Sequence, residues 1–195
     1  MNQEPGTSRI APYLRPISAM LLVLVIVTIQ LRVQGRLWTC ACGSLAIWKS
    51  NVISQHSSQH LFDPYAFTHV LHGVILFWGL NAIRALRSPA WKLWWCIALE
   101  GLWEILENSP LIIDRYRNET AALGYEGDTI INALGDIFSC ALGFELTRRL
   151  GFRRSLAFFV GLELVLLFWI RDNLTLNVLM LVWPIEAIKN WQLNL

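Results

Sequence analysis

Six apolar runs constrain what this chain can fold into more than any other feature of its sequence. They cover residues 17–31, 66–83, 91–107, 128–146, 155–170 and 174–188. A run near 20 residues matches the thickness of a bilayer, and a shorter run can cross when its polar flanks reach the interface. Backbone groups in lipid must be hydrogen-bonded within their own segment. The runs therefore predict an all-α, polytopic helical membrane protein with about six transmembrane helices.

The composition supports a membrane protein and excludes other classes. Of the 195 residues, 55% are hydrophobic and only 15% are charged. The formal net charge of +2 and the lack of a basic run with interleaved aromatic residues exclude nucleic acid as a partner. The predicted partner is the lipid bilayer, and the sequence predicts no oligomeric state. Residues 1–16 are interpreted as a short cytoplasmic tail, and residues 17–195 as a single transmembrane helical domain.

The distribution of basic residues predicts the orientation, because lysine and arginine are retained on the cytoplasmic side. With both termini cytoplasmic, ten basic residues fall on the inner side and six on the outer side. The loops 37–65 and 108–127 then face outward. The polar residues 171–173 are interpreted as a turn between the last two runs, since one continuous helix would bury an Arg and an Asp near its middle.

Three carboxylates in the third run indicate a functional site. Glu100, Glu104 and Glu107 are spaced by four and then three residues, which places them on one face of a helix. A carboxylate at membrane depth is costly and therefore marks a site where it is needed. We expect this face to turn inward while the opposite face meets lipid.

Other polar residues fall at the same predicted depth, near the outer end of their runs or in the outer loops. We expect them to form one pocket with three roles. The predicted catalytic residues are Glu104, Glu107, His72 and Asp128, the predicted binding residues are Arg115, Arg117, Arg171, Asp172, Asn132 and Asp136, and the predicted metal ligands are His69, His72, Glu104 and Glu107.

Two chemistries fit these residue types. Histidines three apart on a helix, with carboxylates from neighbouring helices, can hold a divalent metal that activates water or polarises a phosphate or acyl group of a lipid. Alternatively, a glutamate and a histidine can act as general base and acid without a metal. No His-Glu-x-x-His motif is present to decide between them. Cys40 and Cys42 lack a second pair in the sequence that would complete a zinc site.

Structural and non-enzymatic interpretations remain open beside the enzyme. The buried acids could pair with Arg115, Arg117 and Arg171, while small residues such as Gly73 and Gly143 allow close helix contact. The enzyme hypothesis is a hydrolase or transferase acting on a lipid or lipid-linked substrate. The alternative is a component that transports, gates or assists assembly, and a transporter predicts a continuous polar path to the inner side.

Several longer motifs resemble a known family. They are Ser-Gln-His-Leu at residues 58–61, Thr-His-x-x-His-Gly at 68–73, the segment 107–117, Gly-Asp at 127–128, and the segment 171–181 with the polar ending after Pro184. On these motifs the chain resembles uncharacterised protein family 0314, also described as domain of unknown function 2585. The resemblance implies a bacterial multi-pass inner-membrane protein. It implies no activity and no catalytic residue.

Overall fold

All regular elements among residues 11–193, the part of the chain that the computed structural model describes, are helices. The eight helices are α1 (Ala11–Val33), α2 (Ala66–Ala82), α3 (Pro89–Glu107), α4 (Pro110–Glu119), α5 (Ile130–Leu150), α6 (Phe152–Ile170), α7 (Leu174–Val182) and α8 (Glu186–Leu193). Outside them, one isolated bridge pairs Trp48 with Phe62 within residues 34–65, which connect α1 to α2. The predicted all-α class is confirmed.

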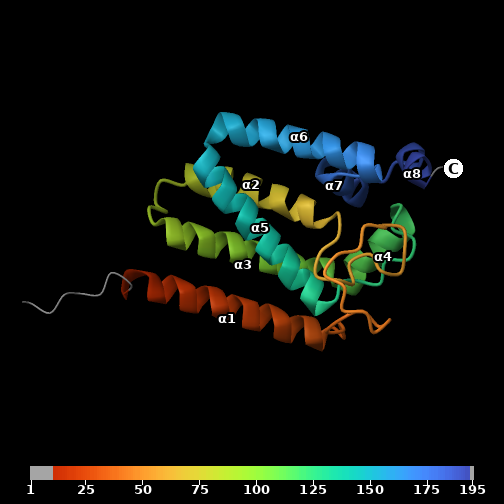
Figure 1. Cartoon of the computed structure of the whole chain (residues 1–195), viewed down its shortest axis with the longest axis horizontal. Coiled ribbons are helices and arrows are strands. Elements are labelled where there is room, and N and C mark those ends of the chain that lie inside the picture. The colour runs from red at the N-terminus through yellow and green to blue at the C-terminus, as the bar shows by residue number, and fades with distance from the viewer. Residues whose placement is uncertain (1–10, 194–195) are drawn as a thin grey trace, which may run out of the picture.

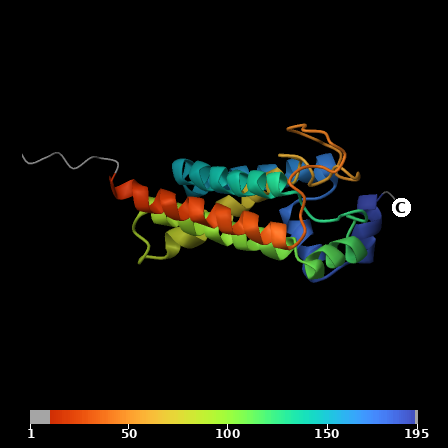
Figure 2. The same cartoon turned by 90° about the horizontal axis from the view of Figure 1, so that it is seen from below.

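Five long helices make an elongated bundle. Helices α1, α2, α3, α5 and α6 run along its long axis, and α5 crosses obliquely between them (Figure 1). Helices α4, α7 and α8 gather with residues 34–65 at one end, where α1 ends and α2 begins; the second view agrees (Figure 2). That end therefore carries most of the irregular and short elements.

The closest helix packing joins α2 to α5 through glycines. A Cβ added to Gly73 would overlap the backbone of Cys140 and Phe144, and one added to Gly143 would overlap the backbone of Val70. Small residues allow such backbone contact in helix pairs. Apolar clusters on either side of the crossing then join α1, α3 and α5, and α2, α6 and α7.

Local sequence explains where several helices begin and end. Pro110 occupies the first turn of α4, and Ser109 before it is extended, as residues preceding proline prefer. The side chain of Thr129 caps α5 by accepting a hydrogen bond from the Asn132 amide. Helix α5 ends at Gly151, whose φ of 73° suits glycine. These signals separate α3 from α4 and α5 from α6 within a few residues.

The prediction of six spans is wrong. Among the described residues, only 14–33 of α1 and the whole of α5 are long and apolar enough to cross a membrane. Helix α5 is mostly buried, as in the core of a soluble protein, and α1 lies near the N-terminus, where a signal sequence meets the same criteria. The run 174–188 fails because α7 has only 9 residues and is followed by the separate helix α8.

The boundaries of the predicted segments also need correction. Helix α1 begins at Ala11 and not at residue 17, and residues 1–10 of the predicted tail lie outside the described part. The segment 108–127, predicted to be a loop, contains α4. The turn at residues 171–173 does separate two helices, as predicted.

The two described ends of the chain lie at opposite ends of the bundle. Helix α1 begins at the end away from α4, whereas α8 lies beside α4 and α7 (Figure 1). An odd number of long helices, here five, places the beginning and the end of the bundle on opposite sides. If the bundle crosses a membrane, the prediction that both termini are cytoplasmic does not fit this arrangement.

The glycine contact yields a test of the fold. We expect Gly73→Ala to lower the free energy of unfolding by roughly 1–3 kcal/mol, because the added methyl group must push the backbone of α5 away. Gly79→Ala in the same helix is the matched control, since no atom lies within 4 Å of its added Cβ. Alanine is the better helix former, so this control should be neutral or stabilising. Thermal unfolding of the two purified variants measures both effects, and equal melting temperatures would contradict the packing.

Candidate functional site

The carboxylates of α3 turn inward, as their spacing predicts. Glu100 is 2% exposed and Glu104 is 0% exposed, and Glu107 is half-buried at the end of the helix. Leu99 and Leu102 on the other side of α3 are exposed. The helix therefore presents its acids to α2 and α5 and its apolar side chains to the outside.

Two histidines of α2 share Glu100. The Nδ1 atom of His69 lies 2.6 Å from Oε1 of Glu100, and the Nδ1 atom of His72 lies 2.9 Å from the same oxygen. His72 also packs edge-on against the ring of Trp103. Glu100 is thus the acid with the most direct histidine contacts. Its spacing of four from Glu104 placed it on the predicted inward face, although no catalytic, binding or metal-ligating role was predicted for it.

Glu104 lies deeper in the same cluster without a hydrogen-bond partner. Its Oε1 atom is 3.5 Å from Nδ1 of His69, and Nε2 of His69 is 3.9 Å from Oδ2 of Asp136 on α5. Both carboxylate oxygens of Glu104 and Oδ1 of Asp136 are buried and have no hydrogen bond within the described chain. Buried polar atoms are normally paired, so these atoms are available for a ligand or a proton.

The acids form three overlapping groups in which ligand atoms lie within 4.8 Å of one another. The groups are His69–His72–Glu100, His69–Glu104–Asp136 and Glu104–Glu107–Asp128. The shared members His69 and Glu104 join them into one cluster, which we call the acid–histidine cluster. All predicted metal ligands and all predicted catalytic residues belong to it.

Asp128 is fixed by two segments that converge at the end of the bundle. Asn108 donates from Nδ2 to Oδ2 of Asp128 over 2.7 Å and accepts the Asp128 amide through Oδ1 over 2.7 Å. The Tyr125 hydroxyl donates to the other oxygen, Oδ1, over 2.8 Å. Burial raises the pKa of Asp128, and these donors counter part of that rise.

The predicted binding residues separate into two sets. Asp136 and Asp172 line the cavity, whereas Asn132 is not part of its wall and donates to the backbone carbonyl of His60. The three arginines bind backbone carbonyls: Arg115 those of Leu181 and Val182, Arg117 that of Tyr125, and Arg171 that of Trp191. The ion pairs that the buried acids make within the described chain are with histidines.

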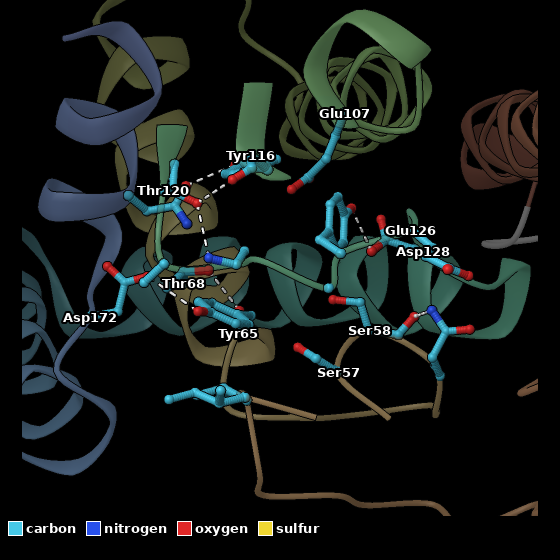
Figure 3. A pocket seen from close by; sticks show the side chains of 18 of the residues that line it. Ser57, Ser58, Tyr65, Thr68, Glu107, Tyr116, Thr120, Glu126, Asp128 and Asp172 are labelled. Atoms are coloured by element: carbon cyan, nitrogen blue, oxygen red, sulfur yellow. Dashed lines mark hydrogen bonds between the residues drawn. The ribbon is translucent and has the colours of Figure 1, made fainter. Parts of the chain in front are cut away.

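A cavity of about 680 Å³ lies between the acid–histidine cluster and the end of the bundle. Glu107 points into it between Tyr116 and Asp128, and Tyr65 and Asp172 line another part (Figure 3). Apolar residues such as Ile53, Val178 and Met180 make up much of the remaining wall. The tyrosines were not predicted, because single tyrosines outside the apolar runs carry no spacing signal.

Glu163, which no predicted role included, has a structural function. One carboxylate oxygen accepts the Leu174 amide over 2.9 Å, and the other accepts the amide and hydroxyl of Thr175. A negative charge at a helix N-terminus is stabilising. Glu163 therefore attaches the start of α7 to α6 and is separate from the cluster.

Comparisons with known proteins support the resemblance seen in the sequence. A family model described as "Protein of unknown function (DUF2585)" matches residues 31–194. The chain is 42% identical over 186 residues to a UPF0314 protein of Paracoccus denitrificans (strain Pd 1222), covering 95% of this chain and 94% of the relative. It is 44% identical over 178 residues to one of Rhizobium meliloti (strain 1021), covering 89% of each. No solved structure gives a significant match.

Asp172 gives a pH-dependent prediction. Burial raises its pKa from the ordinary 3.8 to about 6, despite the hydrogen bond from the Tyr65 hydroxyl. Between about pH 4 and pH 6 the folded state therefore binds more protons than the unfolded chain, so this group lowers the free energy of unfolding as the pH rises. Across the whole titration, the difference between the two pKa values lowers the free energy of unfolding by on the order of 3 kcal/mol.

We expect Asp172→Asn to remove this contribution, so that the variant loses less stability than the parent between pH 4 and pH 6. Asp114→Asn is the control, because Asp114 is exposed on α4. Unfolding followed by circular dichroism at both pH values provides the measurement. An identical pH dependence in the parent and Asp172→Asn would contradict a raised pKa of Asp172 in the folded protein.

Proposed function

The chain belongs to the DUF2585 family, and we propose that it is an integral protein of a bacterial inner membrane, with an enzymatic site for a lipid or lipid-linked substrate. The proposed reaction class is hydrolysis or group transfer. The family is described as one of unknown function, so the proposal rests on the site.

Exposed apolar side chains support a membrane location. Helix α1 leaves eight large apolar side chains exposed on its outer surface, and α6 exposes Val165 and, at 83%, Phe168. Contiguous apolar surface of this extent needs a partner or a lipid environment. We propose that α1 and α5, the two described helices long and apolar enough to span, cross the membrane with α2, α3 and α6 packed against them. In this bundle the acids Glu100 and Glu104 of α3 and Glu163 of α6 face inward.

The carboxylate of Glu104, which accepts no hydrogen bond within the described chain, is the observation that carries the enzymatic proposal. It is fully buried, both oxygens lack a hydrogen bond, and His69, Asp136, Glu107 and Asp128 surround it. Leaving a buried charge in this state is costly unless a cation or a proton completes the site. A purely structural network would satisfy these oxygens within the chain.

Nitrogen and oxygen ligands from several helices suit a divalent ion such as zinc, iron or manganese. His69, Glu104 and Asp136 would hold the ion, with Glu107 and Asp128 beside it. Bound there, the ion would polarise a phosphoryl or acyl oxygen and make water more acidic. His72, which reaches the cavity with Glu100 behind it, can take up or release a proton.

The cavity favours an amphiphilic substrate and a reaction over transport. Its wall combines acids and tyrosines with apolar side chains, as a lipid headgroup and the start of its chains would require. Towards the other end of the bundle, the core is filled by Leu80, Cys96, Cys140 and Phe144. This apolar cluster interrupts the polar path that a transporter would need.

Replacement of Glu104 separates a working site from a structural network. We expect Glu104→Gln to remove the metal bound at the acid–histidine cluster and to leave the fold equally or more stable, because the neighbouring carboxylates repel one another without their ligand. If Glu104 belonged to a structural ion pair, its removal would instead lower the free energy of unfolding by roughly 3–5 kcal/mol. Metal analysis and thermal unfolding of detergent-purified protein measure the two effects.

Glu145→Gln is the matched control, since Glu145 pairs with Arg148 and Arg149 on the surface at the opposite end of α5. It should retain the metal. A marked loss of stability in Glu104→Gln, with the same metal content as the parent, would favour the alternative function as a non-enzymatic transport, gating or assembly component.

The proposed crossing has its own test. In a chain whose native cysteines are replaced, we expect Ser50→Cys and Glu186→Cys to react with an impermeant thiol reagent from the same side, because both residues lie at the cavity end. Ser88→Cys, between α2 and α3, should react from the opposite side. All three positions are exposed. Labelling of Ser50→Cys and Ser88→Cys from one side would exclude a bundle that crosses the membrane.

A further inference from the structure

A second group of metal-ligating side chains lies outside the acid–histidine cluster, in the connection between α1 and α2. Cys40, Cys42, His56 and His60 place one ligand atom each within 4.8 Å of the others. The sequence alone left the Cys-x-Cys pair incomplete, because the histidines follow sixteen and twenty residues after Cys40 in a segment without helices. The fold of residues 34–65 supplies the missing pair.

The distances from His56 to Cys40 and to His60 fit the edges of a tetrahedron around one ion. Zinc–sulfur bonds of about 2.3 Å and zinc–nitrogen bonds of about 2.0 Å imply ligand separations of about 3.5 Å for sulfur and nitrogen and about 3.3 Å for two nitrogens. The Sγ atom of Cys40 lies 3.7 Å from Nδ1 of His56. That Nδ1 atom lies 3.4 Å from Nε2 of His60.

The surrounding hydrogen bonds orient the same atoms. The Nδ1 atom of His60 lies 3.2 Å from the carbonyl oxygen of Ala46, so it carries the proton and leaves Nε2 as the free ligand. The Cys42 amide donates to Sγ of Cys40, and the Ser44 amide donates to Sγ of Cys42, each over 3.4 Å. Amide donors stabilise sulfur atoms that carry negative charge.

We propose that Cys40, Cys42, His56 and His60 bind one zinc ion that holds residues 34–65 in place over the cavity. Two cysteines and two histidines form a closed, four-ligand set, which is typical of structural zinc. Cys40, Cys42 and residues 52–55 and 57–59 line the cavity, so the ion fixes one of its walls. The connection has little other regular structure, since its one bridge joins Trp48 to Phe62. This site shares no residue with the acid–histidine cluster and does not depend on the proposed function.

Cobalt substitution tests the proposal with a signal that the acid–histidine cluster cannot give. In the full chain, purified in detergent under reducing conditions and freed of metal, we expect added Co²⁺ to give a thiolate-to-metal charge-transfer band. One equivalent of Zn²⁺ should remove this band. Cys42→Ser should weaken the band, because Cys40 then supplies the one remaining thiolate of the site, and should weaken zinc binding at least about tenfold, since loss of even a hydrogen-bond partner of a ligand costs 10–100-fold. Cys42 is exposed, so its replacement should not disturb folding.

Two controls assign the signal to the loop. Glu104→Gln should keep the band, which also separates this proposal from the proposed function. Cys96→Ala should keep it too, because Cys96 lies in the helix core beside Cys140. In the parent protein, zinc should also slow alkylation of Cys42, a measurement that needs no variant.

The proposal is overturned by absence of the charge-transfer band in the parent, by a band of unchanged intensity in Cys42→Ser, or by an alkylation rate that zinc leaves unchanged. A band lost in Glu104→Gln with the fold intact would also overturn it, because the signal would then belong to the other cluster.

Discussion

The backbone contact between α2 and α5 determines the geometry of the site. Gly73 follows His72 directly, and at this glycine α2 meets the backbone of Cys140 and Phe144. Because the helices touch there without intervening side chains, His69 comes within 3.9 Å of Asp136 on α5. A larger residue at the crossing would separate the histidines from the acids that they face. Helix packing and the chemistry of the site therefore depend on the same small residues.

The cluster is unbalanced in charge, and this imbalance distinguishes it from a structural network. Five carboxylates face two histidines, and Glu100 makes the close contacts with both rings. Glu163 shows how the chain satisfies a buried acid when the acid is structural, because both of its oxygens accept hydrogen bonds from α7. Glu104 has no such partners. The contrast within one fold supports a ligand at Glu104.

Local patterns predicted the helices and the inward face of α3, but long-range contacts decided the rest. The spacing of Glu100 and Glu104 was sufficient to place both on one buried face, since helical periodicity is a local property. The prediction of a sixth span was wrong because residues 174–188 have the composition of a span but form two separate helices, the first of which ends at Val182. The meeting of His56 and His60 with Cys40 arises from loop folding and has no periodic signal in the sequence. The backbone roles of Arg115 and Arg117 were equally hidden, since they depend on where α7 and Tyr125 lie.

The bonds between Glu100 and the two histidines also bear on how the chain enters a bilayer during synthesis. Helix α3 alone would carry three carboxylates into hydrocarbon, which is unfavourable for a single helix. Helix α2 is made immediately before it and carries His69 and His72, which lie within hydrogen-bonding distance of Glu100. In the proposed membrane protein, α2 and α3 would therefore insert together as a helical hairpin that already satisfies one of the three acids. The remaining two would stay costly until α5 arrives with its own polar face, so the biogenesis of this bundle would be coupled across three helices.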